Sequence, residues 1–345
     1  MKFSLFRSAA LVCLLFSPST LAYECDDGPL KIFLLDGQSN MVGMGSLEHL
    51  KILLNDPNTH EEYAHLWNTT STDWAERSDV YIKFDDQIGK LTAGLGAAGP
   101  SRGGHIGPEL EFGWVLGDHL HCPCSHPILL LKSAYGGRNL AIDFRPPLSG
   151  MGNYSGVKPV HHGWEYREMI ANIQNTLDND LPSIMPNYNK DKGYELAAFV
   201  WFQGWNDMLN WDMVKEYEYN LANLIRSVRL DLDAPTLSVI IGELGMHGLH
   251  PTGRGTDRVM AMRAAEERIC QMDEFRQSSI FVPTAKYVVD NGTDYNGDYH
   301  YNGRADTYCH IGKAFGRAML KLLKRNSTTR SKDEVSLRGS LSTTS

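Results

Sequence analysis

Short apolar runs alternate along this chain with longer segments in which apolar residues recur every three or four positions. The apolar runs predict β-strands at residues 31–35, 127–132, 196–202, 237–242 and 280–283. Because these runs are apolar at nearly every position, they are typical of strands that are buried on both faces. The pattern therefore indicates a central, mainly parallel sheet.

The longer segments predict amphipathic α-helices at residues 107–121, 165–181, 214–232, 256–272 and 305–323. One apolar stripe runs along the third of these, formed by Leu221, Leu224, Ile225, Val228 and Leu232. Strands that alternate with such helices predict an α/β fold, in which helices cover both faces of the sheet.

Two regions fall outside this alternation. Residues from about 46 to 104 lack clear periodicity and predict a long loop region, and loops of this length often frame a binding cleft. Residues 326–345 are rich in Ser, Thr and charge, and predict a disordered tail. We therefore expect one domain, from about residue 24 to residue 325.

The N-terminus has the pattern of a secretory signal peptide. Lys2 and Arg7 precede an apolar run at residues 9–16, and small residues before Ala22 suit cleavage there. The run is much shorter than the roughly 20 apolar residues that span a bilayer, so residues 1–22 predict export to the extracellular space. In an exported eukaryotic protein, Asn-X-Ser/Thr sequences are candidate glycosylation sites, and they begin here at Asn68, Asn153, Asn291 and Asn326.

The net charge bears on the kind of partner, and the cysteine count bears on disulfide bonding. The formal net charge is -8 and the pI is about 5.9, which argues against a nucleic-acid partner because such proteins need a basic surface. Removal of residues 1–22 leaves five cysteines, so at least one thiol is free or pairs between chains. Disulfides are expected after export, but the sequence leaves their pairing and the oligomeric state open.

A serine stands directly after the first predicted strand, in the sequence DGQSNM at residues 36–41. A nucleophile on such a turn, here Ser39, lies at the carboxyl edge of the sheet, where open α/β folds bind ligands. The helix N-terminus and free backbone N–H groups can stabilise a developing oxyanion. Serine is also a common helix cap, so this motif alone fits a structural role equally well.

Three further segments carry candidate chemistry. The second strand is followed by Gly136 and Gly137, whose backbone can approach a ligand closely and donate an N–H. The strand at 196–202 leads into QGWND at 203–207, where Asn206 offers a side-chain amide. His300 lies between the last predicted strand and the last helix, and histidine is the usual general base for a serine nucleophile.

Together and in this order, the four segments resemble the SGNH hydrolase superfamily. DGQSNM is similar to the first block of the sialate O-acetylesterase and carbohydrate esterase family 6 group, in which Gly-Gln-Ser-Asn replaces the Gly-Asp-Ser-Leu of the lipase-like branch. The resemblance runs from about residue 31 to 319, and includes the segments 107–113 and 139–147. It implies a flavodoxin-like three-layer α/β/α sandwich with a mainly parallel sheet.

The resemblance also implies roles for the matching residues. Ser39 is the nucleophile and His300 is the base, while the oxyanion donors are the Ser39 backbone, the Gly136 backbone and the Asn206 side chain. The candidate substrate-binding residues are Gln38, Gln203, Trp205 and Tyr135. Aromatic residues near these motifs that could stack on sugar rings are Tyr135, Trp205, Trp211, Tyr299 and Tyr301. This chemistry needs no metal and no organic cofactor.

The triad acid is the point at which the chain departs from the superfamily. The acid usually stands three residues before the histidine, and that position here is Gly297. We predict that Asp298 orients His300, although Asp294, Asp290 and a Ser–His dyad without an acid stay open.

The expected substrate is an O-acetyl ester on carbohydrate, either sialic acid or an acetylated polysaccharide such as xylan. The third block leaves the sugar open, because carbohydrate members often read Gln-Gly-Glu where this chain has Trp205 after Gly204. Two other functions also fit the sequence. One is a hydrolase of lipid or other carboxyl esters on the same fold, and the other is a carbohydrate-binding protein that has lost catalysis.

Overall fold

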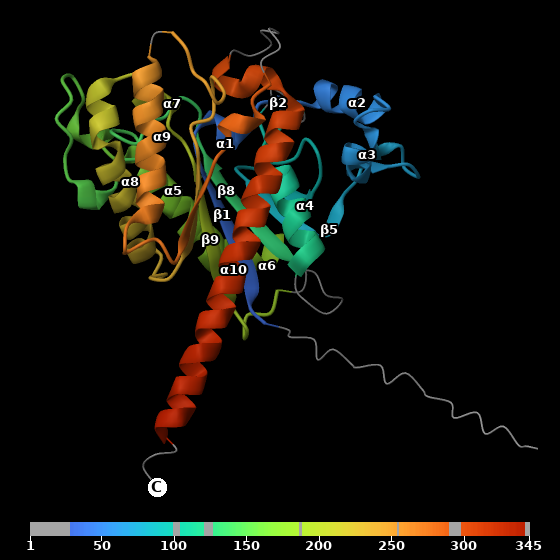
Figure 1. Cartoon of the computed structure of the whole chain (residues 1–345). Helices are drawn as coiled ribbons and strands as arrows, with labels where there is room; N and C mark the ends of the chain where they lie inside the picture. Colours follow the sequence, from blue (N-terminus) through green and yellow to red (C-terminus); the bar gives the residue numbers. More distant parts are fainter. Residues whose placement is uncertain are drawn as a thin grey trace, which may run out of the picture.

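A seven-stranded sheet forms the centre of the computed structural model, with the strand order β11-β10-β9-β1-β8-β5-β6 (Figure 1). The structure describes residues 28–98, 104–120, 127–185, 188–253, 255–289 and 298–341, so the predicted signal peptide lies outside it. The strands are β1 (Leu30–Gly37), β5 (Arg77–Phe84), β6 (Gln87–Leu91), β8 (Ile128–Ala134), β9 (Tyr194–Phe202), β10 (Ser238–Gly242) and β11 (Ser279–Val282). All neighbours are parallel except β5 and β6.

The five predicted strands correspond to β1, β8, β9, β10 and β11, which are the first five strands in this order. The predicted mainly parallel α/β fold is therefore confirmed. β1 lies between β8 and β9, and Gly37 at its carboxyl end is level with Ala134 and Phe202. Apart from Lys31, every residue of β1 is buried, which explains its continuous apolar pattern. The carboxyl ends of the three strands therefore meet at one edge.

Helices cover both faces of the sheet (Figure 1). One face carries α4 (Glu109–Leu120) and α10 (Ala305–Leu341), and the other carries α5 (Trp164–Asn175), α8 (Trp211–Asp231) and α9 (Thr256–Gln271). On the first face, the rings of Phe33 and Phe112 pack edge to face at 5.8 Å. On the second, the indole of Trp201 donates to the Tyr217 hydroxyl at 3.3 Å. Four of the five residues in the predicted stripe of α8 are buried, and Leu232 packs against the core.

The prediction of a long loop over residues 46–104 was wrong. This region contains α2 (Leu47–Asn55), α3 (His60–Tyr63), β5 and β6. In β5 the buried Val80, Ile82 and Phe84 alternate with polar or partly exposed residues, as expected of a strand near the edge of a sheet. The pattern is short and is interrupted by charged residues, so it does not stand out from the sequence.

Short pairs of residues complete this region. β2 (Gly45–Ser46) pairs with β7 (His105–Ile106), and β3 (Trp67–Asn68) pairs with β4 (Asp73–Trp74). β2 leads directly into α2 and contacts the segment Asp298–Gly303, and the β3–β4 hairpin packs Trp74 against Trp67.

Two helices differ from their predicted bounds. The helix predicted at 165–181 changes to a π-helix at Thr176–Asp180 and resumes as α6 (Leu181–Ile184). α10 continues to Leu341, through residues for which we predicted disorder, because several Lys, Arg, Glu and Leu residues in that stretch are good helix formers. Among the helices in the described ranges, none combines the length and the apolar character that crossing a membrane requires. Cys270 and Cys309 carry free thiols, and the other cysteines lie outside the described residues.

Candidate active site

The predicted nucleophile lies on a tight turn between β1 and α1 (Ser39–Val42). Gly37 has a φ of +148°, and a Cβ there would lie 2.2 Å from the carbonyl oxygen of Phe202. Only glycine allows β1 and β9 to approach so closely at this point. The side chain of Ser39 follows at the sheet edge and is 7% exposed.

The structure brings Ser39 and His300 together, although 261 positions separate them in the sequence. Nε2 of His300 lies 2.8 Å from Oγ of Ser39, which is the distance that a general base needs to accept the serine proton. His300 belongs to the 3₁₀ segment Asp298–Gly303, directly before α10.

The backbone after His300 is unusual. Tyr301 and Asn302 both adopt left-handed conformations, with φ values of +54° and +52°, which are uncommon for residues other than glycine. Tyr301 is 2% exposed, and its ring packs edge to face against Tyr308 at 5.5 Å. The predicted sugar-stacking role of Tyr301 is therefore wrong, because the left-handed backbone turns this ring into the core.

Asn40 joins the nucleophile turn to the histidine segment, a role that we did not predict. Its Nδ2 donates to the carbonyl of Tyr299 at 3.0 Å, and its Oδ1 accepts from the Tyr308 hydroxyl at 2.7 Å. Asn40 thus bridges a residue next to His300 and a residue on α10. The only sequence signal is its place directly after Ser39 in the motif.

Two of the predicted oxyanion donors lie around Ser39. A Cβ at Gly136 would have the Ser39 Cβ at 3.9 Å as its nearest neighbour, so this part of the backbone lies beside the nucleophile. The amide nitrogen of Asn206, in α7 (Trp205–Met208), donates one hydrogen to the Gly137 carbonyl at 2.9 Å. An amide carries two hydrogens, so Asn206 retains a second donor for a ligand.

Gln38, which we predicted to contact substrate, bonds to the turn that carries Asn206. It is 2% exposed, and its Nε2 donates to Oδ1 of Asn206 at 3.1 Å. Its Oε1 accepts from the backbone N–H groups of Gly204 at 3.1 Å and Asn206 at 3.4 Å. Because Gln38 holds the oxygen of the Asn206 side chain, it also fixes which way the amide nitrogen points.

Gln203, which we also predicted to contact substrate, makes similar internal bonds. It is 3% exposed, and its Nε2 donates to Asp207 at 2.7 Å and to the Arg138 carbonyl at 3.1 Å. Its Oε1 accepts from the Tyr217 hydroxyl at 3.1 Å. Through these bonds, Gln203 holds the end of β9 against the loop at Arg138 and against α7.

Asp207 is a second positioning residue that we did not predict. Its carboxylate is fully buried and accepts from the backbone N–H groups of Leu140 at 2.8 Å and Ala141 at 2.9 Å. Burial raises the pKa of Asp207 to about 6, although these hydrogen bonds and the one from Gln203 act in the opposite direction. Asp207 thereby ties the loop that follows Gly136 to α7.

Aromatic rings border the histidine. The Tyr299 ring lies 4.4 Å from the His300 ring in an edge-to-face arrangement, and the Trp205 ring lies 5.4 Å from that of Tyr299. Tyr299 is 38% exposed, and Trp205 is half-buried. Tyr135 is half-buried on the other side of the nucleophile, where its backbone N–H donates to Gly37 at 3.0 Å. Of the predicted sugar-stacking residues, these three lie around the Ser39–His300 pair.

The remaining predicted residues either are exposed or lie outside the described part of the chain. Trp211 is 43% exposed at the first residue of α8. Asp290 and Asp294 lie outside the described residues, as does the side chain of Asp298. The identity of the acid therefore stays a prediction.

The comparisons with known proteins agree with this geometry. Residues 29–321 match the sequence model of the family described as carbohydrate esterase, sialic acid-specific acetylesterase. A probable carbohydrate esterase of Arabidopsis thaliana is 24% identical over 222 residues, which are 61% of this chain and 68% of that protein.

Two solved structures share the fold. The crystal structure of an Arabidopsis thaliana protein superposes with a TM-score of 0.54 and 18% identity, over 85% of this chain and 98% of that one. The crystal structure of NanS superposes with a TM-score of 0.53 and 12% identity, over 86% of this chain and 99% of that one. The match of the family to most of the chain establishes membership, so this protein belongs to the sialic acid-specific acetylesterase family of carbohydrate esterases.

Proposed function

We propose that this protein is a secreted serine esterase that removes O-acetyl groups from carbohydrate, with Ser39 as nucleophile and His300 as general base. The observation that carries the proposal is the 2.8 Å contact between Nε2 of His300 and Oγ of Ser39, at the carboxyl edge of the sheet. Family membership supports the reaction class, and the predicted signal peptide supports secretion.

The first half of the reaction acylates Ser39. Its Oγ attacks the carbonyl carbon of the acetyl ester while its proton passes to Nε2 of His300. The negative charge that develops on the carbonyl oxygen is stabilised by the N–H groups of Ser39 and Gly136 and by the Asn206 amide. Removing one such donor costs about 3 kcal/mol of transition-state stabilisation in comparable enzymes.

The imidazolium of His300 then gives its proton to the sugar oxygen as the bond between that oxygen and the carbonyl carbon breaks, and the sugar leaves Ser39 acetylated. The second half of the reaction releases acetate. Water then loses a proton to Nε2 and attacks the acyl-enzyme, and Ser39 recovers its proton as acetate leaves. Asp298 remains the predicted group that orients His300, with Asp294 and Asp290 as the alternatives.

The sugar is proposed to be sialic acid or an acetylated polysaccharide such as xylan. The name of the family specifies sialic acid, while the Arabidopsis relative is described only as a probable carbohydrate esterase. Trp205 and Tyr299 beside His300 offer aromatic faces for a sugar ring.

Acetate release from acetylated sialic acid and from acetylated xylan tests this proposal. We expect Ser39→Ala and His300→Ala each to lower kcat by roughly 10⁴-fold or more, because the pair acts as a unit. Ser183→Ala is the matched control, since Ser183 is exposed on α6 and its hydroxyl donates to the Asp180 carbonyl just before that helix. Undiminished turnover by Ser39→Ala would overturn the mechanism. A chain-length series of p-nitrophenyl esters would reveal a lipid hydrolase by its preference for long chains.

A further inference from the structure

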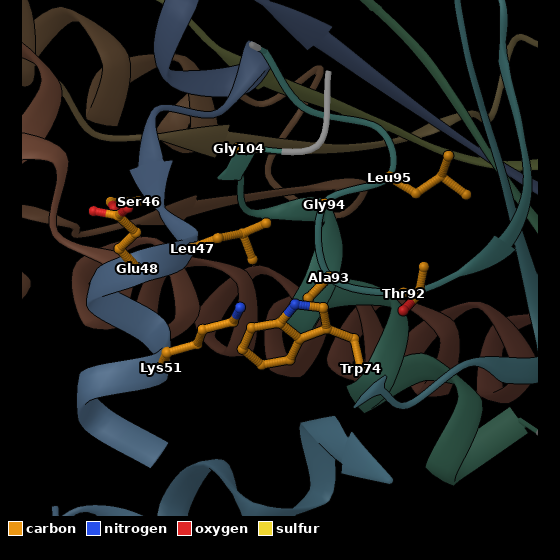
Figure 2. Close-up of a pocket in the computed structure, with 10 residues that line it drawn as sticks. All are labelled: Ser46, Leu47, Glu48, Lys51, Trp74, Thr92, Ala93, Gly94, Leu95 and Gly104. Carbon is orange, nitrogen blue, oxygen red and sulfur yellow. The ribbon is translucent and has the colours of Figure 1, made fainter. Parts of the chain in front are cut away.

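A pocket of about 580 Å³ lies between the start of α2 and Trp74 (Figure 2). Its walls come from residues 46–48 and Lys51 at the start of α2, from Trp74 in β4, and from residues 92–95 and Gly104. The volume is within the range of about 300–1,000 Å³ that is typical of small-molecule sites. None of the predicted catalytic residues lines this pocket, so the proposed mechanism does not use it.

Trp74 gives the pocket an aromatic wall. Its ring is half-buried and packs edge to face against Trp67 at 5.4 Å, which fixes its orientation. Figure 2 shows Leu47 and Lys51 directed toward this ring. The face of an indole carries partial negative charge, and it therefore attracts the weakly positive C–H groups on the flat side of a sugar ring.

Polar groups on the other walls suit a hydroxylated ligand. Lys51 directs an ammonium group toward Trp74, and Glu48, three residues earlier on α2, adds a carboxylate at the rim that is directed away from the ring (Figure 2); both side chains are exposed. Because the two charges are opposite and the protein as a whole carries a formal charge of -8, the pocket does not favour an anion. Ammonium and carboxylate groups both hydrogen-bond well to neutral hydroxyls.

The pocket is connected to the segment that carries His300. Glu48 also lines a smaller cavity of about 110 Å³, whose opposite wall includes Asn302 and Gly303. The backbone N–H of Ala305 donates to Nδ1 of His49 at 3.0 Å, which fixes α2 against the start of α10. α2 therefore stands between the pocket and the proposed catalytic histidine.

We propose that this pocket is a second carbohydrate-binding site, which takes a neutral sugar segment of the same chain whose acetyl ester reaches Ser39. The inference rests on the proposed function, and it names the substrate class as a polysaccharide or long oligosaccharide rather than a single sugar. A remote site raises the local concentration of a long substrate at the catalytic edge. It does nothing for a small ester.

Binding is tested first, by ¹⁹F NMR of protein labelled with 5-fluorotryptophan. The chain has 7 tryptophans, and the resonance of Trp74 is assigned by its disappearance in Trp74→Phe. We expect xylohexaose or mannohexaose, neither of them acetylated, to shift this resonance, and trigalacturonate to leave it unchanged. Absence of a shift with both neutral sugars, or a shift with the acidic sugar alone, would overturn the proposal.

Kinetics provide the second test. We expect Trp74→Ala to lower kcat/KM for acetylated xylan about tenfold through KM, with hydrolysis of p-nitrophenyl acetate unchanged, as loss of one aromatic contact implies. Trp74→Phe keeps an aromatic face and should recover most of the loss. The matched control is Tyr219→Ala, which removes an aromatic ring that is 56% exposed on α8.

The outcomes distinguish failure of the second sugar site from failure of the proposed esterase function. If Trp74→Ala does not fold, Lys51→Ala replaces it, since Lys51 is exposed and points to the same wall. An equal loss on the polymer and on the small ester would overturn the second site and leave the esterase intact. If the unaltered protein releases no acetate from any carbohydrate, the proposed function fails, and the ¹⁹F titration still decides whether the pocket binds sugar.

Discussion

The two members of the Ser39–His300 pair are held in different ways. Ser39 follows a central strand whose close approach to β9 admits only glycine at position 37, and the buried Gln38 bonds to the opposite turn. His300 lies on a short segment of irregular backbone, with left-handed residues at 301 and 302. The sheet itself therefore positions Ser39, whereas His300 lies outside the sheet and depends on side-chain contacts to stay aligned with Ser39.

The number of contacts that position each catalytic side chain also differs between the two sides. On the nucleophile side, Gln38, Gln203 and Asp207 form a buried network that ties β1, β9 and the loop after β8. On the histidine side, besides the contact between His300 and Ser39 itself, Asn40 bonds to Tyr299 and Tyr308, and the ring of Tyr299 packs against His300. Substitutions on the two sides should therefore differ in their effects on kcat and on stability.

Beyond the Ser39–His300 pair itself, the largest effect is expected at Asn206, the proposed oxyanion donor of the nucleophile side. Asn206→Ala removes an amide that Gln38 already orients, so the barrier should rise with little change in substrate binding. We expect kcat for acetate release to fall about 10²- to 10³-fold at similar KM. Asn210→Ala, which removes an exposed helix cap four residues away, is the control and should retain activity. A loss confined to KM would assign Asn206 to substrate binding instead.

The next effect is on stability, at Asp207. Burial raises the pKa of this carboxyl from 3.8 to about 6, so the folded protein binds the proton more tightly than the unfolded chain does. The free energy of unfolding that this group contributes should therefore fall as the pH rises from about 4 to about 6, and stay constant above. Two pKa units correspond to a change of about 3 kcal/mol.

Urea unfolding of the wild type and Asp207→Asn between pH 4 and pH 8 measures this change. The wild-type advantage over the variant should shrink across the lower half of the range, with the exposed Asp212→Asn as the control for loss of a carboxylate. A difference that does not vary with pH in this range would show that the pKa of Asp207 is not raised, because the hydrogen bonds from Leu140 and Ala141 offset or outweigh its burial.

The third effect concerns the link between the two sides. Asn40→Ala removes the bonds to Tyr299 and Tyr308, so His300 should lose its alignment with Ser39. We expect kcat to fall about 30-fold with KM unchanged, equivalent to about 2 kcal/mol. In a double-mutant cycle, Tyr308→Phe should add little to Asn40→Ala, because both act through one bond. Fully additive losses would mean that Asn40 does not act through Tyr308.

The same comparison explains how much of the site the sequence predicted. Ser39, Gly136 and Asn206 each follow an apolar strand, and the carboxyl ends of parallel strands share one edge, so their meeting could be predicted. His300 was identified by its place before the last helix. The closeness of Ser39 and His300 agrees with both predictions, while their chemical roles await the tests above.

What the sequence did not predict depends on packing. Gln38 and Gln203 stand in the motif like substrate ligands, and only the fold shows that their amides bond to Asn206 and Asp207. Tyr301 is an aromatic residue beside the base, yet the left-handed backbone at that position buries it. Side-chain direction on an irregular segment does not follow a period, so no pattern in the sequence reveals it.

The smallest effect tests whether packing alone steadies the base. Tyr299→Ala removes the ring that lies 4.4 Å from His300, while the backbone carbonyl that accepts from Asn40 remains. We expect kcat/KM for p-nitrophenyl acetate to fall only about three- to fivefold, since one aromatic contact contributes about 1 kcal/mol. Tyr299→Phe keeps the ring and should match the wild type. If Tyr299 also stacks on sugar, the loss on acetylated carbohydrate will exceed the loss on the small ester, and equal losses will restrict Tyr299 to holding the histidine.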